Sequence, residues 1–434
     1  DMSPGISSRL PCDHLPSLSL YLEEDLPSLV SLYMDLHAHP ELSGHEVRTS
    51  GIIAGEMENA GFRAARGIGG HGVVGVLVNG EGPVVMIRAD MDALPLEEAT
   101  GLAYASRERG TTPDGKEVGI MHACGHDLHS TVLVGTARLL ARIRGEWSGT
   151  VVLVAQPSEE TVSGAQRMIQ DGLYTRFPRP DCALSLHVSP DLPPGHIGYR
   201  EGVFTAGAES LDITVRGIGG HAAHPDRCRD PIVLSAQLIL QFQTIITREV
   251  PAGEFGLITV ASIHGGTKHN AIPDEVHLQA NIRFFDPRVR DLILSSIARV
   301  CEHAARSAGI PEDRLPVITL MEESVPPLRN DPGVTAKVIA ALIPYFGKDR
   351  IHRIAALTGS EDFGLFGDVC PPIPLCYLRL GTGSVGGAYL HSPRFCLDPD
   401  GSIRNGVTAM SLAALACLAS QRDQRGQPSP AGGM

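Results

Sequence analysis

The sequence is poor in aromatic residues and in basic charge, and it has no long uninterrupted apolar segment. Aromatic residues make up 5% of the 434 residues, with one tryptophan, so an aromatic platform for stacking bases is not expected. No apolar run reaches the roughly 18–20 residues that span a bilayer. Asp and Glu outnumber Lys and Arg, 49 against 36, so the basic face that nucleic acid requires is missing. We expect no nucleic-acid partner and no membrane partner.

Signals for secretion are also missing. The first 35 residues lack a basic n-region, an apolar h-region and a small-residue cleavage site, and Glu23, Glu24 and Asp25 interrupt their apolar positions. The nine cysteines are odd in number and scattered, which favours reduced thiols over a disulfide framework. These patterns predict a cytoplasmic protein.

Apolar runs alternate with helix-like segments over the first 200 residues. This alternation is typical of an α/β fold with a mixed, mostly parallel sheet and helices on both faces. Helical spacing covers 20–37, and Asp25-Leu26-Pro27 favours a helix start there. Beyond Gly202 the pattern changes to strand, helix, strand, strand, helix, strand, which predicts an α+β sandwich.

The predicted organisation is therefore an α/β domain interrupted by an inserted α+β domain. The predicted boundaries are 1–204 for the first part of the catalytic domain, 205–323 for the inserted lid and dimerisation domain, 324–420 for the second part, and 421–434 for a disordered tail. The tail is polar and rich in Pro and Gly, a composition that does not support a packed core.

The richest group of ligand side chains is Met121–Ser130, which contains three imidazoles, a thiol and a carboxylate. Cys124 and His126 are two positions apart, so they cannot share a helix face but can converge from a loop or strand end. A thiolate and an imidazole suit zinc, and also manganese, cobalt or nickel with less preference. The pattern leaves open whether His122 and His129 bind metal, orient ligands or belong to the core.

Further ligand types follow predicted strands. Glu159 and Glu160 come after the apolar run 150–155, and His187 ends the next run. Successive residues of an extended chain point in opposite directions. One glutamate can therefore bind metal while its neighbour takes a proton from water and returns it to a leaving amine, as amide hydrolysis requires. His391 is a further candidate ligand.

Seven motifs, in this order and spacing, resemble those of the aminoacylase and carboxypeptidase family of metallopeptidases, peptidase family M20. The resemblance covers residues 30–420 and is strongest to the amidohydrolase branch, which contains N-acyl-amino-acid amidohydrolases, hippurate hydrolases and auxin-conjugate hydrolases. The motifs are 121–130, 156–160, 186–187, 219–223, 270–273, 360–363 and 390–393.

The resemblance implies a binuclear metal-dependent amidohydrolase that cleaves N-acyl amino acids, or similar amide conjugates, to a carboxylic acid and a free amino acid. Its cofactors would be two divalent metal ions, zinc or manganese, with cobalt or nickel as further options. Glu159 would be the catalytic base, and Asp90 would support the site rather than bind metal. The implied metal ligands are Cys124, His126, Glu160, His187 and His391.

The resemblance also assigns roles to the inserted domain. His221 would stabilise the oxyanion, from the same or a partner subunit, and Asn270 and Arg283 would bind the substrate carboxylate. The domain at 205–323 would join a homodimer or a tetramer. Two alternatives stay open: a metallo-aminopeptidase or dipeptidase of the same family, and a catalytically silent, dimeric metal-binding protein.

Overall fold

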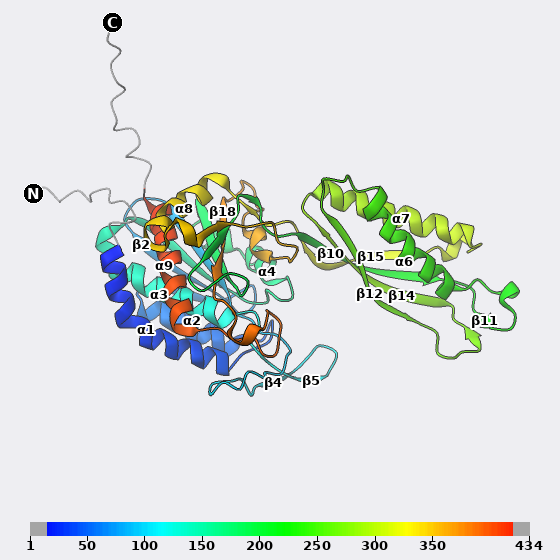
Figure 1. Ribbon diagram of the computed structural model, residues 1–434, viewed down its shortest axis with the longest axis horizontal. Coiled ribbons are helices and arrows are strands. Elements are labelled where there is room, and N and C mark those ends of the chain that lie inside the picture. Colours follow the sequence, from blue (N-terminus) through cyan, green and yellow to red (C-terminus); the bar gives the residue numbers. More distant parts are fainter. Residues whose placement is uncertain (1–14, 420–434) are drawn as a thin grey trace, which may run out of the picture. The chain divides into compact units, whose positions relative to one another are not determined.

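The computed structural model describes residues 15–419, which form two compact units (Figure 1). The first unit contains 15–202, Arg329–Ala355 and 362–419, and the second contains Val203–Leu328 and Ala356–Glu361. The tail predicted at 421–434 lies outside the described residues. The chain therefore leaves the first unit twice: once for Val203–Leu328, which is most of the second unit, and again for the short segment Ala356–Glu361.

The first unit is built on an eight-stranded sheet in the order β1-β2-β6-β3-β7-β18-β8-β17. The pairs β6–β3, β3–β7, β7–β18 and β8–β17 are parallel, and the other three are antiparallel. The predicted mixed, mostly parallel sheet is confirmed. Its strands are β1 (Arg63–Ile68), β2 (Gly72–Asn79), β3 (Val84–Asp90), β6 (Gly149–Gln156), β7 (Cys182–Ser189), β8 (Ile197–Tyr199), β17 (Ile351–Arg353) and β18 (Leu375–Gly381).

Helices cover both faces of this sheet. One face packs on α1, α3 and α9 through a large apolar core that includes Ile87 of β3. Arg88 points to the opposite face, where α4 and the short 3₁₀ helix η6 (Asp362–Phe366) lie. The helices are α1 (Leu15–Ala38), α2 (Val47–Asn59), α3 (His126–Arg142), α4 (Gly164–Gln170), α5 (Leu173–Arg176), α8 (Pro332–Phe346) and α9 (Pro399–Leu418).

Helix α1 corrects one sequence expectation. The helix does not start at Asp25-Leu26-Pro27 but runs through Pro27. Leu22, Leu26 and Leu29 recur at helical spacing and are buried in the core, and this packing outweighs the hydrogen bond that an interior proline removes. Pro27 lies on the exposed side of the helix, where water can reach the carbonyl left without a partner.

The second unit is an antiparallel sheet in the order β12-β14-β10-β15, with α6 and α7 packed on it. Both helices begin at a proline preceded by an aspartate cap: Asp230 accepts a hydrogen bond from the Ile232 N–H, and Asp286 accepts one from the Arg288 N–H, each at 2.8 Å. Its main elements are β10 (Gly207–Arg216), β11 (Gly220–His221), α6 (Pro231–Arg248), β12 (Gly256–Gly265), β13 (Ala271–Ile272), β14 (Glu275–Phe284), α7 (Pro287–Ser307) and β15 (Val317–Val325).

Short strands complete the pairing in two-stranded ribbons. The ribbons are β4 (Arg109–Thr111) with β5 (Glu117–Gly119), β11 with β13, and β9 (Gly202–Val203) with β16 (Arg329–Asn330). Among residues 15–419, no helix combines the length and the hydropathy that crossing a bilayer demands.

The fold brings the carboxyl ends of β6, β3, β7 and β18 to the same edge of the sheet, because these neighbours are parallel. Asp90 at the end of β3 pairs with Gln156 at the end of β6. His187 near the end of β7 pairs with Arg379 of β18. The carboxyl edge of an open α/β sheet is where ligands usually bind.

Arg88 connects this edge to η6. Its guanidinium is fully buried and donates to Gln156 Oε1 at 2.7 Å, to Asp90 Oδ2 at 2.8 Å and to Asp362 Oδ1 at 3.0 Å. Gln156 in turn donates to both oxygens of Asp362. Because every charge here is paired, the network is stable only while it is complete.

Replacing Arg88 tests whether the buried network depends on its cation. We expect Arg88→Met to lower the free energy of unfolding by about 3–5 kcal/mol, because two carboxylates would stay buried without their cation. Urea denaturation measures the change. In the control Arg109→Met the lost partner, Glu117, is exposed, so we expect no comparable loss of stability. An equal effect of both substitutions would contradict the role given to Arg88.

Candidate metal centre

The motif 121–130 places Cys124 and His126 at the start of α3, directly against the end of β7. Gly125 precedes the helix with a φ of +81°, a conformation that glycine adopts without strain. A Cβ at Gly125 would lie 2.6 Å from Cγ2 of Val188. Glycine therefore lets the motif approach β7, which carries His187.

Two histidines are held with Nε2 available as a ligand. His126 Nδ1 lies 2.9 Å from the backbone oxygen of Asp92, and His187 Nδ1 lies 2.8 Å from the backbone oxygen of Val188. A carbonyl accepts only from a protonated nitrogen, so in the neutral form of each ring Nε2 carries the lone pair. His187 Nε2 is 3.4 Å from Cys124 Sγ. Both rings are buried and oriented toward the same place.

The two glutamates lie in a tight turn after β6. Ser158 has a φ of +55°, and its N–H donates to Glu46 Oε1 at 2.8 Å. The N–H of Glu160 donates to Asp92 Oδ2 at 3.0 Å. The carboxylates of Glu46 and Asp92, which come from two distant segments, therefore fix the backbone on both sides of Glu159.

His391 comes from a loop far along the chain. Its backbone has a φ of +61°, which is unusual for a residue other than glycine and typical of functional sites. Its N–H donates to the backbone oxygen of Ala123 at 2.8 Å, and its Nε2 is 3.6 Å from Glu160 Oε1. The loop is thus joined to the motif that contains Cys124.

All five predicted ligands meet in two groups that share Cys124. Cys124, His126 and His187 form one group, and Cys124, Glu160 and His391 form the other, with ligand atoms in each group within 4.8 Å of one another. The atoms fit cations, because His126 Nε2 and Glu160 Oε1 are buried without a hydrogen-bond partner among the described residues. A thiolate, imidazoles and a carboxylate form a donor set for zinc and similar ions.

The concentration of negative charge around His126 also favours the binding of cations. Four carboxylate oxygens lie within 3.9 Å of the His126 ring nitrogens; they belong to Asp90, Asp92, Glu159 and Glu160. Burial and the charge of Asp92 raise the pKa of Glu160 to about 7. Burial and the charge of Glu160 raise the pKa of the Cys124 thiol. A bound divalent ion would reverse both effects, because it stabilises the thiolate and the carboxylate.

The other histidines of the motif have different surroundings. His129 Nδ1 lies 2.6 Å from Asp90 Oδ1, and its Nε2 accepts the Val188 N–H at 3.0 Å, so both nitrogens are already used. His122 is buried and belongs to none of the ligand groups, and burial lowers its pKa to about 4. Neither is placed to bind an ion together with Cys124.

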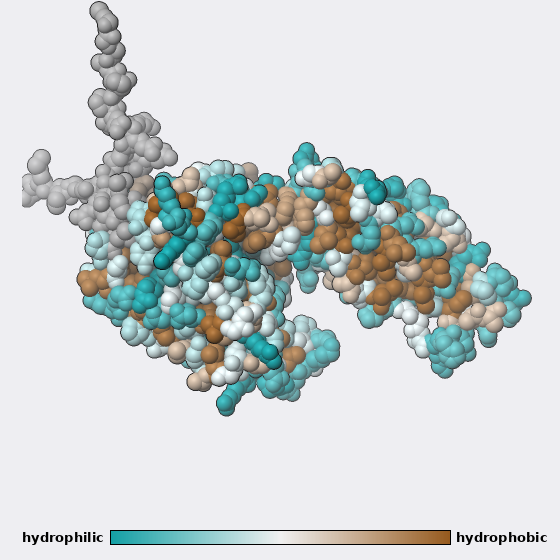
Figure 2. All heavy atoms as spheres, in the orientation of Figure 1, coloured by the Kyte–Doolittle hydropathy of each residue, from teal (hydrophilic) through white to brown (hydrophobic). Residues whose placement is uncertain are grey.

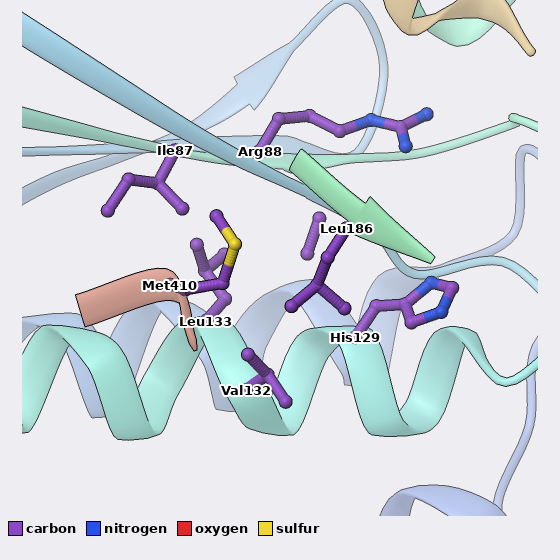
Figure 3. A pocket seen from close by; sticks show the side chains of 8 residues that line it. Ile87, Arg88, His129, Val132, Leu133, Leu186 and Met410 are labelled. Carbon is purple, nitrogen blue, oxygen red and sulfur yellow. The ribbon is translucent and has the colours of Figure 1, made fainter. Parts of the chain in front are cut away.

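His129 also lines a small apolar pocket behind the ligand cluster (Figure 3). The pocket lies between the sheet and α3, and Ile87, Leu186 and Met410 are among the apolar residues that line it. Leu186 and His187 are adjacent in β7 and therefore point to opposite faces. This pocket is packing space beneath the sheet and not the place where the ligands meet.

The three remaining predicted residues belong to the second unit, where they fall into two places. His221 in β11 and Asn270 lie together: His221 pairs with Ala271, and the backbone oxygen of Asn270 accepts the Ala222 N–H. Arg283 is near the far end of the ten-residue strand β14 and donates to Asn281 and Ser360. At about 3.3 Å per residue, one small carboxylate cannot contact both Asn270 and Arg283 of one chain.

Two supporting residues were missed in the sequence. Asp92 contacts His126 and the Glu160 N–H, so it orients two predicted ligands together. Its place just after a buried strand was a usable signal. Glu46 offered no comparable signal, because its contact with Ser158 crosses 112 positions of sequence.

The fold and this cluster together define a metal-dependent hydrolase. A sequence model described as peptidase family M20/M25/M40 matches residues 86–416. N-acetylcysteine deacetylase of Bacillus subtilis is 32% identical over 378 residues, which cover 86% of this chain and 92% of that protein. An IAA-amino acid hydrolase of Arabidopsis thaliana is also 32% identical, over 86% of this chain and 81% of that protein.

Solved structures agree with the sequence matches. A dinuclear metal-binding peptidase of family M20 from Bacillus subtilis superposes with a TM-score of 0.75 and 28% identity, over 91% of this chain and 99% of that chain. The chain therefore belongs to peptidase family M20/M25/M40, and it is a metal-dependent amidohydrolase.

The buried carboxyl of Glu46 leads us to predict how the stability of the protein depends on pH. Burial and the charge of Asp92 raise its pKa to about 7. An acid whose pKa is higher in the folded state loses stability as pH rises from its ordinary value through 7. Glu46→Gln keeps an oxygen for the Ser158 N–H and removes this loss. In chelator-treated protein we expect the variant to be more stable at pH 8 by up to about 3 kcal/mol, and the gain to vanish below pH 4.5.

Thermal unfolding at both pH values measures this difference. Glu58→Gln, at an exposed position of α2, is the matched control and should behave as the parent protein at each pH. A Glu46→Gln protein that is no more stable than the parent at pH 8 would show that Glu46 carries no buried charge.

Proposed function

We propose that this enzyme hydrolyses the amide bond of N-acyl amino acids and releases a carboxylic acid and a free amino acid. The observation that carries the proposal is the meeting of Cys124, His126, Glu160, His187 and His391 in two ligand groups with Glu159 beside them. The names of the deacetylase and the IAA-amino acid hydrolase support acylated amino acids as the substrate class.

In this proposal the residues that would hold two divalent ions are Cys124, His126, Glu160, His187 and His391. Such ions would supply polarisation of the scissile carbonyl and a lower pKa for the attacking water. Zinc is the first candidate, because thiolate and imidazole prefer it, and manganese is the second. The thiolate must stay reduced, and the eight cysteines among the described residues form no disulfides, in line with a reducing, cytoplasmic location.

Glu159 is the proposed general base. Its Oε2 lies 3.9 Å from His126 Nε2, so the carboxylate borders the cluster. The Ser158 and Glu160 N–H groups are each held by a carboxylate, and this restricts how far Glu159 can move. Glu159 would take a proton from the attacking water and deliver it to the departing amine nitrogen.

His221 is the proposed oxyanion donor, and it is exposed on β11 together with Asn270. Because Arg283 lies at the other end of β14, we propose that His221 and Asn270 act in the site of a second copy of the chain. Arg283 is the proposed contact of the substrate carboxylate, because a guanidinium fork suits a carboxylate.

Glu159→Gln tests the chemistry. The amide keeps the shape of the side chain but cannot accept the proton, so we expect kcat for N-acetyl, N-benzoyl and indole-acyl amino acids to fall at least 10²-fold. The metal content, measured by mass spectrometry, should stay that of the parent. Glu81→Gln at the surface is the control. Unchanged hydrolysis by Glu159→Gln would refute its role, and absence of metal-dependent hydrolysis by the parent across the panel would refute the proposed function.

A homodimer through the second unit is part of the proposal. Strand β12 is at an edge of its sheet, and apolar side chains gather at the surface of this unit (Figure 2). Leu240 of the neighbouring helix α6 is 70% exposed. An unpaired strand edge beside exposed apolar residues favours association with a second copy.

Leu240→Glu tests this surface. A charge in an apolar interface is costly, so we expect the variant to shift toward monomer in sedimentation velocity. The control Leu20→Glu changes a leucine of α1 that is 59% exposed and should leave the assembly unchanged. A parent protein that sediments as a monomer would rule out the proposed dimer.

A further inference from the structure

Arg379 is a buried arginine beside the ligand cluster that none of the proposed roles uses. It lies on β18, and its paired residues are His187 on β7 and Gly198 on β8. Directly paired residues of a sheet point to the same face, so the side chains of Arg379 and His187 lie side by side. Arg379 is 7% exposed, and its Nε is buried without a hydrogen-bond partner among residues 15–419.

Such an arginine is costly to bury. A guanidinium stays charged at all accessible pH values, and a cation removed from water is destabilising unless an anion compensates it. Arg88, on the same face of the sheet, shows the usual solution, with two carboxylates and an amide around it. The corresponding anion is missing from the described surroundings of Arg379.

The positive charge of Arg379 acts on groups in the cluster. After the larger effect of burial, it lowers the pKa of His187. The pKa of Tyr389, which burial raises, also depends on the charges of Arg379 and Cys124. Neighbouring strands are about 4.8 Å apart, so the Arg379 side chain leaves the backbone one strand away from His187, a proposed metal ligand. Gly198 leaves room for it, because a Cβ there would lie 3.2 Å from the Arg379 Cβ.

We propose that Arg379 binds a carboxylate of the substrate. This inference rests on the proposed hydrolysis of N-acyl amino acids. The carboxylate has three sources in such a substrate: the acyl group, the amino-acid side chain, or the α-carboxylate. A planar guanidinium binds a carboxylate through two parallel hydrogen bonds, and the site therefore favours substrates that carry a negative charge near the scissile amide.

The structural alternative involves Asp191. This residue is exposed, and after the larger effect of burial its carboxylate raises the pKa of Tyr389, whereas Arg379 lowers it. The alternative is that Asp191 is the anion that pairs with Arg379. In that case Arg379 would support the fold without contacting substrate, and its replacement would lower stability but leave substrate preference unchanged.

Three pairs of substrates identify the carboxylate. They are N-succinyl-L-alanine with N-succinamoyl-L-alanine, N-acetyl-L-glutamate with N-acetyl-L-glutamine, and N-acetyl-L-alanine with its amide. For the parent enzyme we expect a higher kcat/KM for the charged member of at least one pair. Arg379→Gln should reduce that preference at least 10-fold, because a charge-assisted hydrogen bond is lost, and Arg379→Lys should restore part of it.

Arg353→Gln is the matched control. Arg353 is an exposed arginine of β17 in the same sheet, paired with Glu201, and its loss should not change the preference within any pair. Metal content and melting temperature of each variant show whether the protein is folded and loaded. If Arg379→Gln does not fold, the preference of Arg379→Lys for the charged member of each substrate pair, compared with that of the parent, tests the role of Arg379.

Binding without turnover gives a second readout. Calorimetry with zinc-loaded protein should show that Arg379→Gln binds succinate at least 10-fold more weakly than the parent does, with little change for succinamate. Equal affinities for succinate, together with unchanged preferences in all three pairs, would overturn the inference. If the parent hydrolyses no acyl amino acid, the proposed function fails, and the succinate titration still decides the role of Arg379.

Discussion

The carboxylates gathered around His126 are the constraint on which the rest of the site depends. Asp90, Asp92, Glu159 and Glu160 each place an oxygen within 3.9 Å of its ring nitrogens, in surroundings that exclude most water. Like charges at this spacing repel strongly in a medium of low dielectric. A cation would offset this repulsion, and the Cys124 thiolate would add a further negative ligand. The divalent ions of the proposed function would therefore compensate charge at this edge as well as supply its chemistry.

Two aspartates beside the ligands have different hydrogen-bond partners, and these contacts orient the ligand side chains. Asp92 fixes His126 and the Glu160 N–H, while Asp90 is already bound to Arg88 and His129. Asp90 also forms a group with His126 and His129 that could hold a metal ion, so the supporting role expected for Asp90 stays a prediction. The chain Arg88–Asp90–His129 ends at the Val188 N–H, next to His187. Hydrogen bonds therefore connect Asp362 of η6 to the backbone next to His187 through Arg88, Asp90 and His129.

The ligand types could be predicted because they follow apolar runs, and parallel strands end at a common edge. Glu160 and His187 carried that signal in the sequence, whereas Cys124 and His126 were indicated by the density of ligand types in 121–130 and His391 was a further candidate. The structure brings the five together, and their binding of metal stays a prediction. Glu46 and Arg379 could not be found, because their roles depend on residues far away in the chain. The helix start at Pro27 was wrong because tertiary packing of α1 overrides the local preference of proline. The sequence did not show that Asn270 lies before β14 and Arg283 near its far end, and their contacts with the substrate carboxylate stay predictions.

The binuclear site itself is tested most directly by anomalous diffraction from zinc-loaded crystals, recorded above and below the zinc absorption edge. The account predicts two anomalous peaks per chain, one between Cys124, His126 and His187 and the other between Cys124, Glu160 and His391, with the sulfur near both. A single peak, or peaks that do not contact Cys124, would contradict the shared-thiolate site.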